Sequence, residues 1–135
     1  MRIATEHPYV TRVRRAKEVF DRNRNDPAPL YDLHAEDVVL HAPGSSPLGG
    51  GVRGRANVFS RLQQMAELSG GTFEAVSTSL SGNGNFVALL HHVVATRGDK
   101  RLDQTLAELW RFENNRCVEV WAQFSDQRAW DAFWR

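Results

Sequence analysis

The chain is short of several features that would tie it to a special environment. Cys117 is the single cysteine in 135 residues, so neither an internal disulfide nor a cysteine-based metal site can form. No apolar run approaches the ~20 residues that a membrane-spanning helix needs. The opening residues, MRIATEHPYV, lack the apolar segment of a signal peptide. We therefore expect a cytoplasmic protein without a membrane partner.

The chain also lacks a strong net charge. Its formal charge is +1 at pH 7 and its pI is near 8.0, whereas nucleic-acid-binding domains are strongly basic and carry a recognition motif. We expect no nucleic-acid partner. What is present is an ordinary globular composition, 41% hydrophobic and 24% charged. The length suits a single domain, residues 1–135.

Helices come first along the chain and strands follow. Apolar residues at helical spacing predict a helix from Pro8 to about residue 24 and another between Gly54 and Gly70, with a short helix over PAPLYDLHA between them. Val38–Ala42 reads as a brief strand. Four β-rich runs then follow, and they are Thr72–Leu80, Phe86–Thr96, Leu102–Phe112 and Cys117–Phe124. Short turn-forming links join them, which indicates antiparallel neighbours. A final helical segment follows from Asp126. The order predicts an α+β domain with one curved, mixed, mostly antiparallel sheet.

A glycine-rich stretch, GGGVRG at residues 49–54, fits the G-x-G-x-x-G pattern of dinucleotide-binding proteins. That motif requires a strand directly before its first glycine and a parallel βαβ unit around it. Here Pro43–Leu48 intervene, and the later strand connections are hairpins. We interpret the stretch as a loop at the rim of the fold, where glycine permits sharp turns and close backbone approach.

Three segments carry a family resemblance: HAPGSSPLGGGVRG after the first strand, ELSGGTF after the third helix, and LWRFENNRCVEVWAQFSDQ near the end. With this element order, the chain resembles the SnoaL-like branch of the nuclear transport factor 2-like superfamily, which includes polyketide cyclases and relatives of ketosteroid isomerase. The resemblance covers nearly the whole chain. It implies a sheet wrapped by N-terminal helices into a cone with an internal ligand pocket. It also implies a homodimer formed through the outer face of the sheet, where Trp121 would project.

Residue by residue, the resemblance transfers only in part. Ketosteroid isomerases place a base immediately before the proline after strand one and a tyrosine on helix one; Ala42 and Glu18 stand there. The same steroid chemistry is therefore not expected. Glu108 in ELWRF matches their second acidic residue. Asp126 lies near the acid/base aspartate of the cyclases, and His41 takes the place of a water-binding asparagine in limonene epoxide hydrolases.

Alternation along the strands places Glu108 on an apolar face, between Leu106 and Trp110. A three-residue ENN loop, pairing Phe112 with Arg116, keeps this face and the apolar face of the last strand on one side, and we expect that loop. The residues expected to contact a ligand are Leu40, Leu90, Leu106, Trp110, Val120 and Phe124.

Two adjacent histidines on the expected strand Phe86–Thr96, His91 and His92, leave one question open. With a three-residue loop at Gly98–Lys100, His92 faces the pocket; with a two-residue turn, His91 does. The family alignment favours His92, while periodicity alone leaves both possible.

Several functional classes fit these residues. The first is an acid/base enzyme acting on a hydrophobic, polyketide-like or terpenoid-like molecule, with Glu108, His92, His41 and Asp126 as catalytic residues and with no metal or cofactor. The alternative is a non-catalytic ligand-binding or interaction module. A third hypothesis is a metal site formed by His41, His92 and Glu108. Structural roles compete at each position: an arginine salt bridge for Glu108, loop support for His41 and a helix N-cap for Asp126.

Overall fold

The computed structural model describes residues 6–23 and 27–135. Within these ranges the helices are α1 (Pro8–Arg22), α2 (Ala28–Leu33), α3 (Arg55–Leu68) and α4 (Gln127–Trp134). The strands are β1 (His34–His41), β2 (Val52–Arg53), β3 (Glu74–Asn83), β4 (Phe86–Arg97), β5 (Lys100–Glu113) and β6 (Arg116–Phe124). The predicted end of the first helix, about residue 24, lies outside the described residues. In the described chain no helix is long and apolar enough to cross a membrane.

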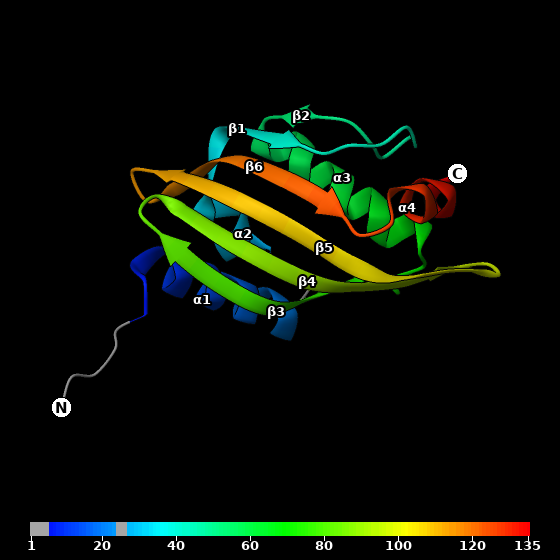
Figure 1. Ribbon diagram of the computed structural model, residues 1–135, viewed down its shortest axis with the longest axis horizontal. Helices are drawn as coiled ribbons and strands as arrows, with labels where there is room; N and C mark the ends of the chain where they lie inside the picture. Colours follow the sequence, from blue (N-terminus) through cyan, green and yellow to red (C-terminus); the bar gives the residue numbers. More distant parts are fainter. Residues whose placement is uncertain (1–5, 24–26) are drawn as a thin grey trace.

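One sheet organises the molecule (Figure 1). Among the described residues it has six strands in the order β2-β1-β6-β5-β4-β3. β1 runs parallel to β6, and the other neighbours are antiparallel. The predicted α+β class with a mixed, mostly antiparallel sheet is confirmed. The glycine-rich stretch forms the short strand β2, which pairs with β1 at Leu40 and Val52, so no parallel βαβ unit surrounds it.

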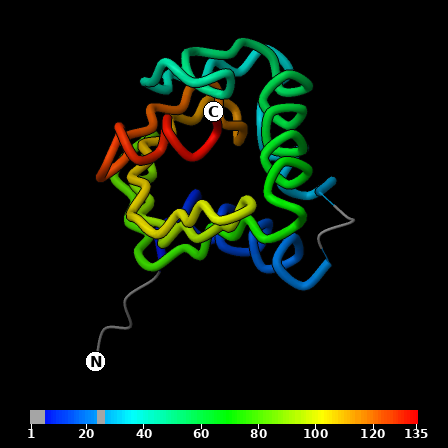
Figure 2. Tube along the Cα trace, turned by 90° about the vertical axis from the view of Figure 1, so that its right-hand side faces the viewer, coloured from blue at the N-terminus to red at the C-terminus, as the bar shows by residue number. Residues whose placement is uncertain are grey.

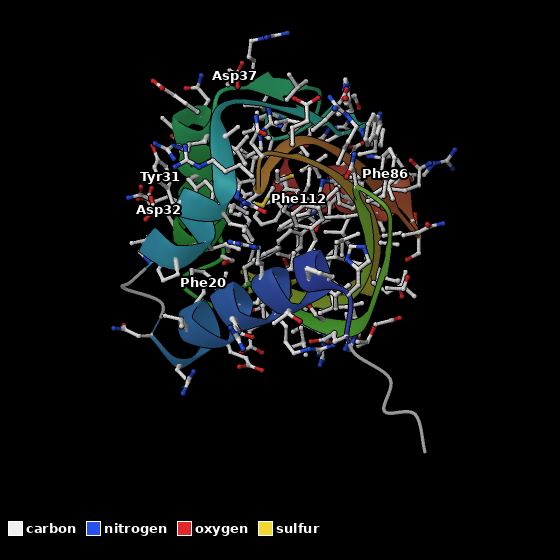
Figure 3. The ribbon with its side chains drawn as sticks, turned by 90° about the vertical axis from the view of Figure 1, so that its left-hand side faces the viewer. Phe20, Tyr31, Asp32, Asp37, Phe86 and Phe112 are labelled. Atoms are coloured by element: carbon white, nitrogen blue, oxygen red, sulfur yellow. The ribbon has the colours of Figure 1, made fainter. Side chains whose placement is uncertain are left out.

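The helices cover one face of the curved sheet, which we call the inner face; the opposite side is the outer face. In Figure 1, α1 and α3 lie behind the strands. Seen from the α4 end, the strands curve around one side and α3 covers the other (Figure 2). Seen from the opposite end, Phe112 lies in the middle of the space that α1, α2 and the strands enclose (Figure 3). Phe112 is fully buried and closes this end.

Two hydrophobic clusters fill the ends of the inner face. The α1/α2 cluster contains Val10, Val13, Ala16, Leu30, Leu33, Val38, Val87, Leu89, Trp110, Phe112, Cys117 and Val120. The α4 cluster contains Leu48, Met65, Val93, Ala95, Leu102, Trp130, Phe133 and Trp134. The long helix α3 supplies Phe59 to the edge of the first cluster and Met65 to the second. The middle of the inner face therefore lies between two separately packed cores.

The turn between β4 and β5 settles the question of the two histidines. Arg97 pairs with Lys100, so the loop has two residues, and Gly98 takes a positive φ of 63°. Glycine adopts this conformation without steric cost. The alternation then places His91 on the inner face. The family-based expectation for His92 was wrong, because the loop is one residue shorter than that alignment needs.

The turn between β5 and β6 also differs from the expectation. Glu113 pairs with Arg116 across a two-residue turn, in which Asn114 and Asn115 both have positive φ, 50° and 67°. These angles match the turn type that best suits the twist of a hairpin. The expected three-residue loop was therefore wrong.

A β-bulge keeps the apolar faces of β5 and β6 together despite the shorter turn. Phe112 pairs with Cys117, but the preceding residue on β5 pairs with Glu119, so β6 holds one extra residue, Val118. The extra residue shifts the register by one. The shorter turn shifts it by one more, so Glu108 pairs with Ala122 instead of Val120.

Candidate functional site

The centre of the inner face carries a polar chain of three side chains. Glu108 on β5 is bonded through Oε1 to Nε2 of His91 on β4, at 2.6 Å. His91 Nδ1 lies 3.1 Å from the hydroxyl of Ser77 on β3. The side chains of His91 and Glu108 are 3% and 18% exposed. Three neighbouring strands thus position a hydroxyl, an imidazole and a carboxylate in series.

The series is able to move a proton. When the imidazole of His91 is neutral, Nε2–H donates to Glu108 and Nδ1 accepts from the Ser77 hydroxyl; when it is protonated, both nitrogens donate. Both states keep every bond, with the hydroxyl of Ser77 turning to suit. Within the described chain Glu108 Oε2 has no hydrogen-bond partner, so this oxygen remains open to another group.

The chain lies at the boundary between the two cores. On β5, Leu106 packs against the α4 cluster and Trp110 belongs to the α1/α2 cluster, with Glu108 between them. Leu106 and Phe124 are only partly buried, as Glu108 is. The carboxylate therefore lies between the two clusters, beside apolar side chains of β5 and β6.

His34 joins this neighbourhood, although the sequence analysis missed it. It is the first residue of β1 and is 5% exposed. Nδ1 lies 2.8 Å from the carbonyl oxygen of Leu30, and the ring packs edge-on against Phe59 and Trp110. Burial lowers the pKa of His34, while the bond to Leu30 and the charge of Glu108 oppose that shift. His34, Val38 and Leu40 are separated by even numbers of residues, as side chains on one face of a strand are. The expected strand began only at Val38, so His34 was not included in this pattern.

His92 and Leu90 lie on the outer face, contrary to expectation. His92 Nε2 is 2.7 Å from Asp103 Oδ1, and these side chains are 53% and 61% exposed. Leu90 is 43% exposed. Their placement follows from the two-residue β4–β5 turn, which reverses the expected faces of β4.

His41 also takes part in an outer-face interaction and not in the Glu108 chain. Its Nε2 is 2.6 Å from Glu119 Oε2, and its ring stacks on Trp121. The bonds from His41 and then Arg111 lower the pKa of Glu119. The geometry therefore does not bring His41, which was expected to be catalytic, together with Glu108. His41, Trp121 and neighbouring residues line a separate surface hollow of about 350 Å³.

Asp126 caps helix α4. Its carboxylate accepts a hydrogen bond from the backbone N–H of Ala129 at 2.9 Å, and its own N–H bonds to Gln104. The N-cap alternative raised by the sequence is what the structure contains.

The remaining expected residues lie on the inner side of the fold. Leu40, Trp110 and Val120 belong to or pack against the α1/α2 cluster. Phe124 packs against the α4 cluster and stacks on Trp130 with centroids 4.0 Å apart. The ligand-contact role of these residues stays a prediction.

Neither a reactive thiol at Cys117 nor the hypothesised metal site is favoured by the geometry of the described residues. Burial raises the pKa of Cys117 to about 12, so the thiol stays protonated and is a poor nucleophile. The three residues of the metal reading do not meet, because His41 and His92 are on the outer face and Glu108 is on the inner face. Across residues 6–23 and 27–135, no His, Cys, Asp and Glu side chains form a group of three that suits a metal ion.

Comparison with known proteins identifies the family. A model described as the SnoaL-like domain matches residues 13–120. The chain belongs to the SnoaL-like family. The resemblance carried by the three sequence segments is thus confirmed over most of the chain.

Other SnoaL-like and structurally related proteins show how far the likeness extends. An uncharacterised protein of Mycobacterium tuberculosis is 32% identical over 112 residues, which are 82% of this chain and 86% of the relative. Bal32a, from a soil-derived mobile gene cassette, is 34% identical with a TM-score of 0.86, over 94% of this chain and 96% of Bal32a. IdmH, a candidate polyketide cyclase of Streptomyces antibioticus, is 20% identical with a TM-score of 0.70, over 88% of this chain and 93% of IdmH. The likeness to IdmH is one of fold.

Proposed function

We propose that this SnoaL-like protein is an acid/base enzyme that acts on an apolar, polyketide-like or terpenoid-like molecule bound at the inner face. The observation that carries the proposal is the Ser77–His91–Glu108 chain between two apolar cores. A carboxylate in apolar surroundings is costly unless it is partnered. His91 provides that partner through one oxygen and leaves the other oxygen open for a ligand.

In the proposed reaction Glu108 Oε2 removes a proton from carbon next to a carbonyl group of the ligand. The carboxyl group so formed keeps its contact with His91, because its Oε1 remains an acceptor and Nε2–H of the neutral imidazole donates to it. Glu108 then returns the proton to a different carbon or to the oxygen. The net result is an isomerisation, or ring closure if the carbanion first attacks a second carbonyl in the same molecule.

A non-catalytic ligand-binding module is the alternative, and one observation favours it. The same histidine–carboxylate contact occurs twice on the outer face, at His92–Asp103 and His41–Glu119. Under this alternative, the inner His91–Glu108 pair only stabilises the fold, and the protein binds a ligand without converting it.

We also propose that the outer face mediates homodimer formation. The exposed large apolar residues on its strands are Val76, Phe86, Leu90, Leu109 and Trp121. Leu109 pairs with Trp121 across β5 and β6, so apolar side chains continue across neighbouring strands. Such patches on soluble proteins mark interaction sites. Trp121→Glu should convert a dimer to a monomer in sedimentation experiments; a wild-type protein that sediments as a monomer contradicts the proposal.

The acid/base proposal is tested with 2-tetralone, an apolar bicyclic ketone with acidic protons next to its carbonyl. Exchange of these protons in D2O is followed by NMR with wild type, Glu108→Gln and the outer-face control Asp103→Asn. We expect wild type and the control to accelerate exchange equally, and Glu108→Gln to lose at least about 100-fold of that acceleration. No acceleration by wild type, or full acceleration by Glu108→Gln, favours the binding-module alternative.

A further inference from the structure

Two polar atoms without protein partners belong to rings that touch. His34 uses Nδ1 to bond Leu30, and in the described chain its Nε2 has no hydrogen-bond partner. Trp110 is 6% exposed, and its Nε1 is buried without a partner among the described residues. The two rings meet edge-on with centroids 4.9 Å apart. Buried polar atoms are rarely left unpaired in native proteins, so the buried indole Nε1–H of Trp110 needs an explanation.

The chemical character of each atom is fixed by its surroundings. Burial lowers the pKa of His34, and the charge of nearby Arg55 acts in the same direction, while Glu108 and the bond to Leu30 oppose them. A neutral His34 that donates Nδ1–H to the Leu30 carbonyl has its lone pair on Nε2, which is therefore an acceptor. The indole Nε1–H of Trp110 is a donor only. An acceptor and a donor thus belong to two rings that are in contact.

One functional group satisfies both atoms at once. A hydroxyl group donates one hydrogen bond and accepts others, whereas a carbonyl or ether oxygen only accepts. The neighbouring surfaces are aromatic, because Phe59 also packs edge-on against His34 at a centroid distance of 5.4 Å. A flat ligand bearing a phenolic or enolic hydroxyl matches this combination of ring surfaces and polar atoms.

We propose that His34 and Trp110 form a hydroxyl-binding subsite for a phenolic or enolic ligand, whose O–H donates to His34 Nε2 and accepts from Trp110 Nε1–H. The subsite rests on the proposed function, since it places the ligand on the inner face that carries Glu108. Trp110 and Glu108 alternate on that face of β5, so one ligand reaches both. An enol is also the form that a ketone takes after losing a proton to a base such as Glu108.

The test uses 2-naphthol and 2-methoxynaphthalene, which differ in the single hydroxyl proton. Binding of each to the full chain is measured by titration calorimetry for wild type, His34→Phe, Trp110→Phe and the outer-face control His92→Phe. We expect wild type and the control to bind 2-naphthol at least about 10-fold more tightly than its methyl ether, a difference typical of one lost buried hydrogen bond. The ratio should fall to about one in His34→Phe and be reduced in Trp110→Phe.

A second measurement needs no variant and so does not depend on their folding. In ¹⁵N NMR spectra of wild type, 2-naphthol should shift the signals of His34 Nε2 and of the Trp110 indole, and the methyl ether should shift the former much less. Equal binding of the two compounds overturns the subsite. Two other results also overturn it. One is failure of 2-naphthol to bind. The other is a preference for 2-naphthol that survives in His34→Phe, while 2-naphthol leaves the His34 Nε2 signal of wild type unshifted.

The catalytic proposal fails or stands separately. Glu108→Gln keeps His34 and Trp110, so we expect it to retain the preference for 2-naphthol. If the preference for 2-naphthol is present but wild type does not exchange the protons of 2-tetralone, the enzyme proposal is overturned and the subsite is supported. If wild type exchanges the protons of 2-tetralone but does not prefer 2-naphthol over its methyl ether, the subsite is overturned and the enzyme proposal is supported.

Discussion

His91 and His92 are neighbours on β4, and each places Nε2 within 2.7 Å of a carboxylate oxygen. They point to opposite faces of the sheet. The His91–Glu108 pair is 3% and 18% exposed, whereas the His92–Asp103 pair is 53% and 61% exposed. Water and salt screen the outer pair, so it resembles the surface ion pairs that contribute about 0–1 kcal/mol. Contact geometry alone therefore does not identify a functional pair; burial, apolar neighbours and an open carboxylate oxygen distinguish the inner one.

The largest difference between the faces should come from two adjacent leucines. Leu89 is 1% exposed on the inner face and Leu90 is 43% exposed on the outer face. Leu89→Ala should lower the free energy of unfolding by about 2–5 kcal/mol, because it removes buried contacts and leaves a cavity. Leu90→Ala should lower it by less than about 1 kcal/mol. Urea denaturation measures both, and similar losses would show that the two faces are not distinct in the monomer.

The two histidines should differ in the same direction. His91→Ala leaves Glu108 without its partner in a largely apolar site, and we expect a loss of about 3 kcal/mol in the free energy of unfolding. This lies at the lower end of the usual range because Glu108 keeps 18% of its side-chain exposure. His92→Ala should change the value by about 0.5 kcal/mol or less. If urea denaturation shows equal losses of unfolding free energy for the two variants, the expected difference between the inner and outer pairs is contradicted.

The smallest effect concerns pH and His34. Its pKa is lowered from 6.5 in the folded protein, so below that value the unfolded chain binds more protons than the folded one. The free energy of unfolding should therefore fall as the pH drops from 6.5 toward the folded pKa of His34. The control is His34→Asn, which removes this titration. In this pH range the free energy of unfolding of the variant should depend less on pH than that of wild type. Parallel curves of unfolding free energy against pH would show that His34 does not contribute to the pH dependence.

Much of the fold was predictable because its signals are local. Helical periodicity and short polar links gave the order of elements, and alternation along β5 correctly placed Glu108 among apolar neighbours. The resemblance to the SnoaL-like family, carried by the three sequence segments, agreed with that order.

The partners of Glu108 were not predictable, because they depend on register. A one-residue change in a turn reverses both faces of a strand, and the Gly98-Asp99 turn decides between His91 and His92. The bulge at Val118 compensates for the short Asn114-Asn115 turn, and only the packing of β5 on β6 shows it. His34 was missed because the expected short helix, PAPLYDLHA, extended over it, whereas α2 ends at Leu33 and β1 begins at His34.

A crystal structure of the protein grown with 2-naphthol tests most directly whether the inner face holds the ligand. We predict density for the ring beside Leu106 and Phe124, with its hydroxyl oxygen within hydrogen-bonding distance of His34 Nε2 and Trp110 Nε1. The outer hollow lined by His41 and Trp121 offers about 350 Å³ as a competing location. Density confined to that hollow, with the inner face unchanged, would contradict the assignment of the inner face as the ligand site.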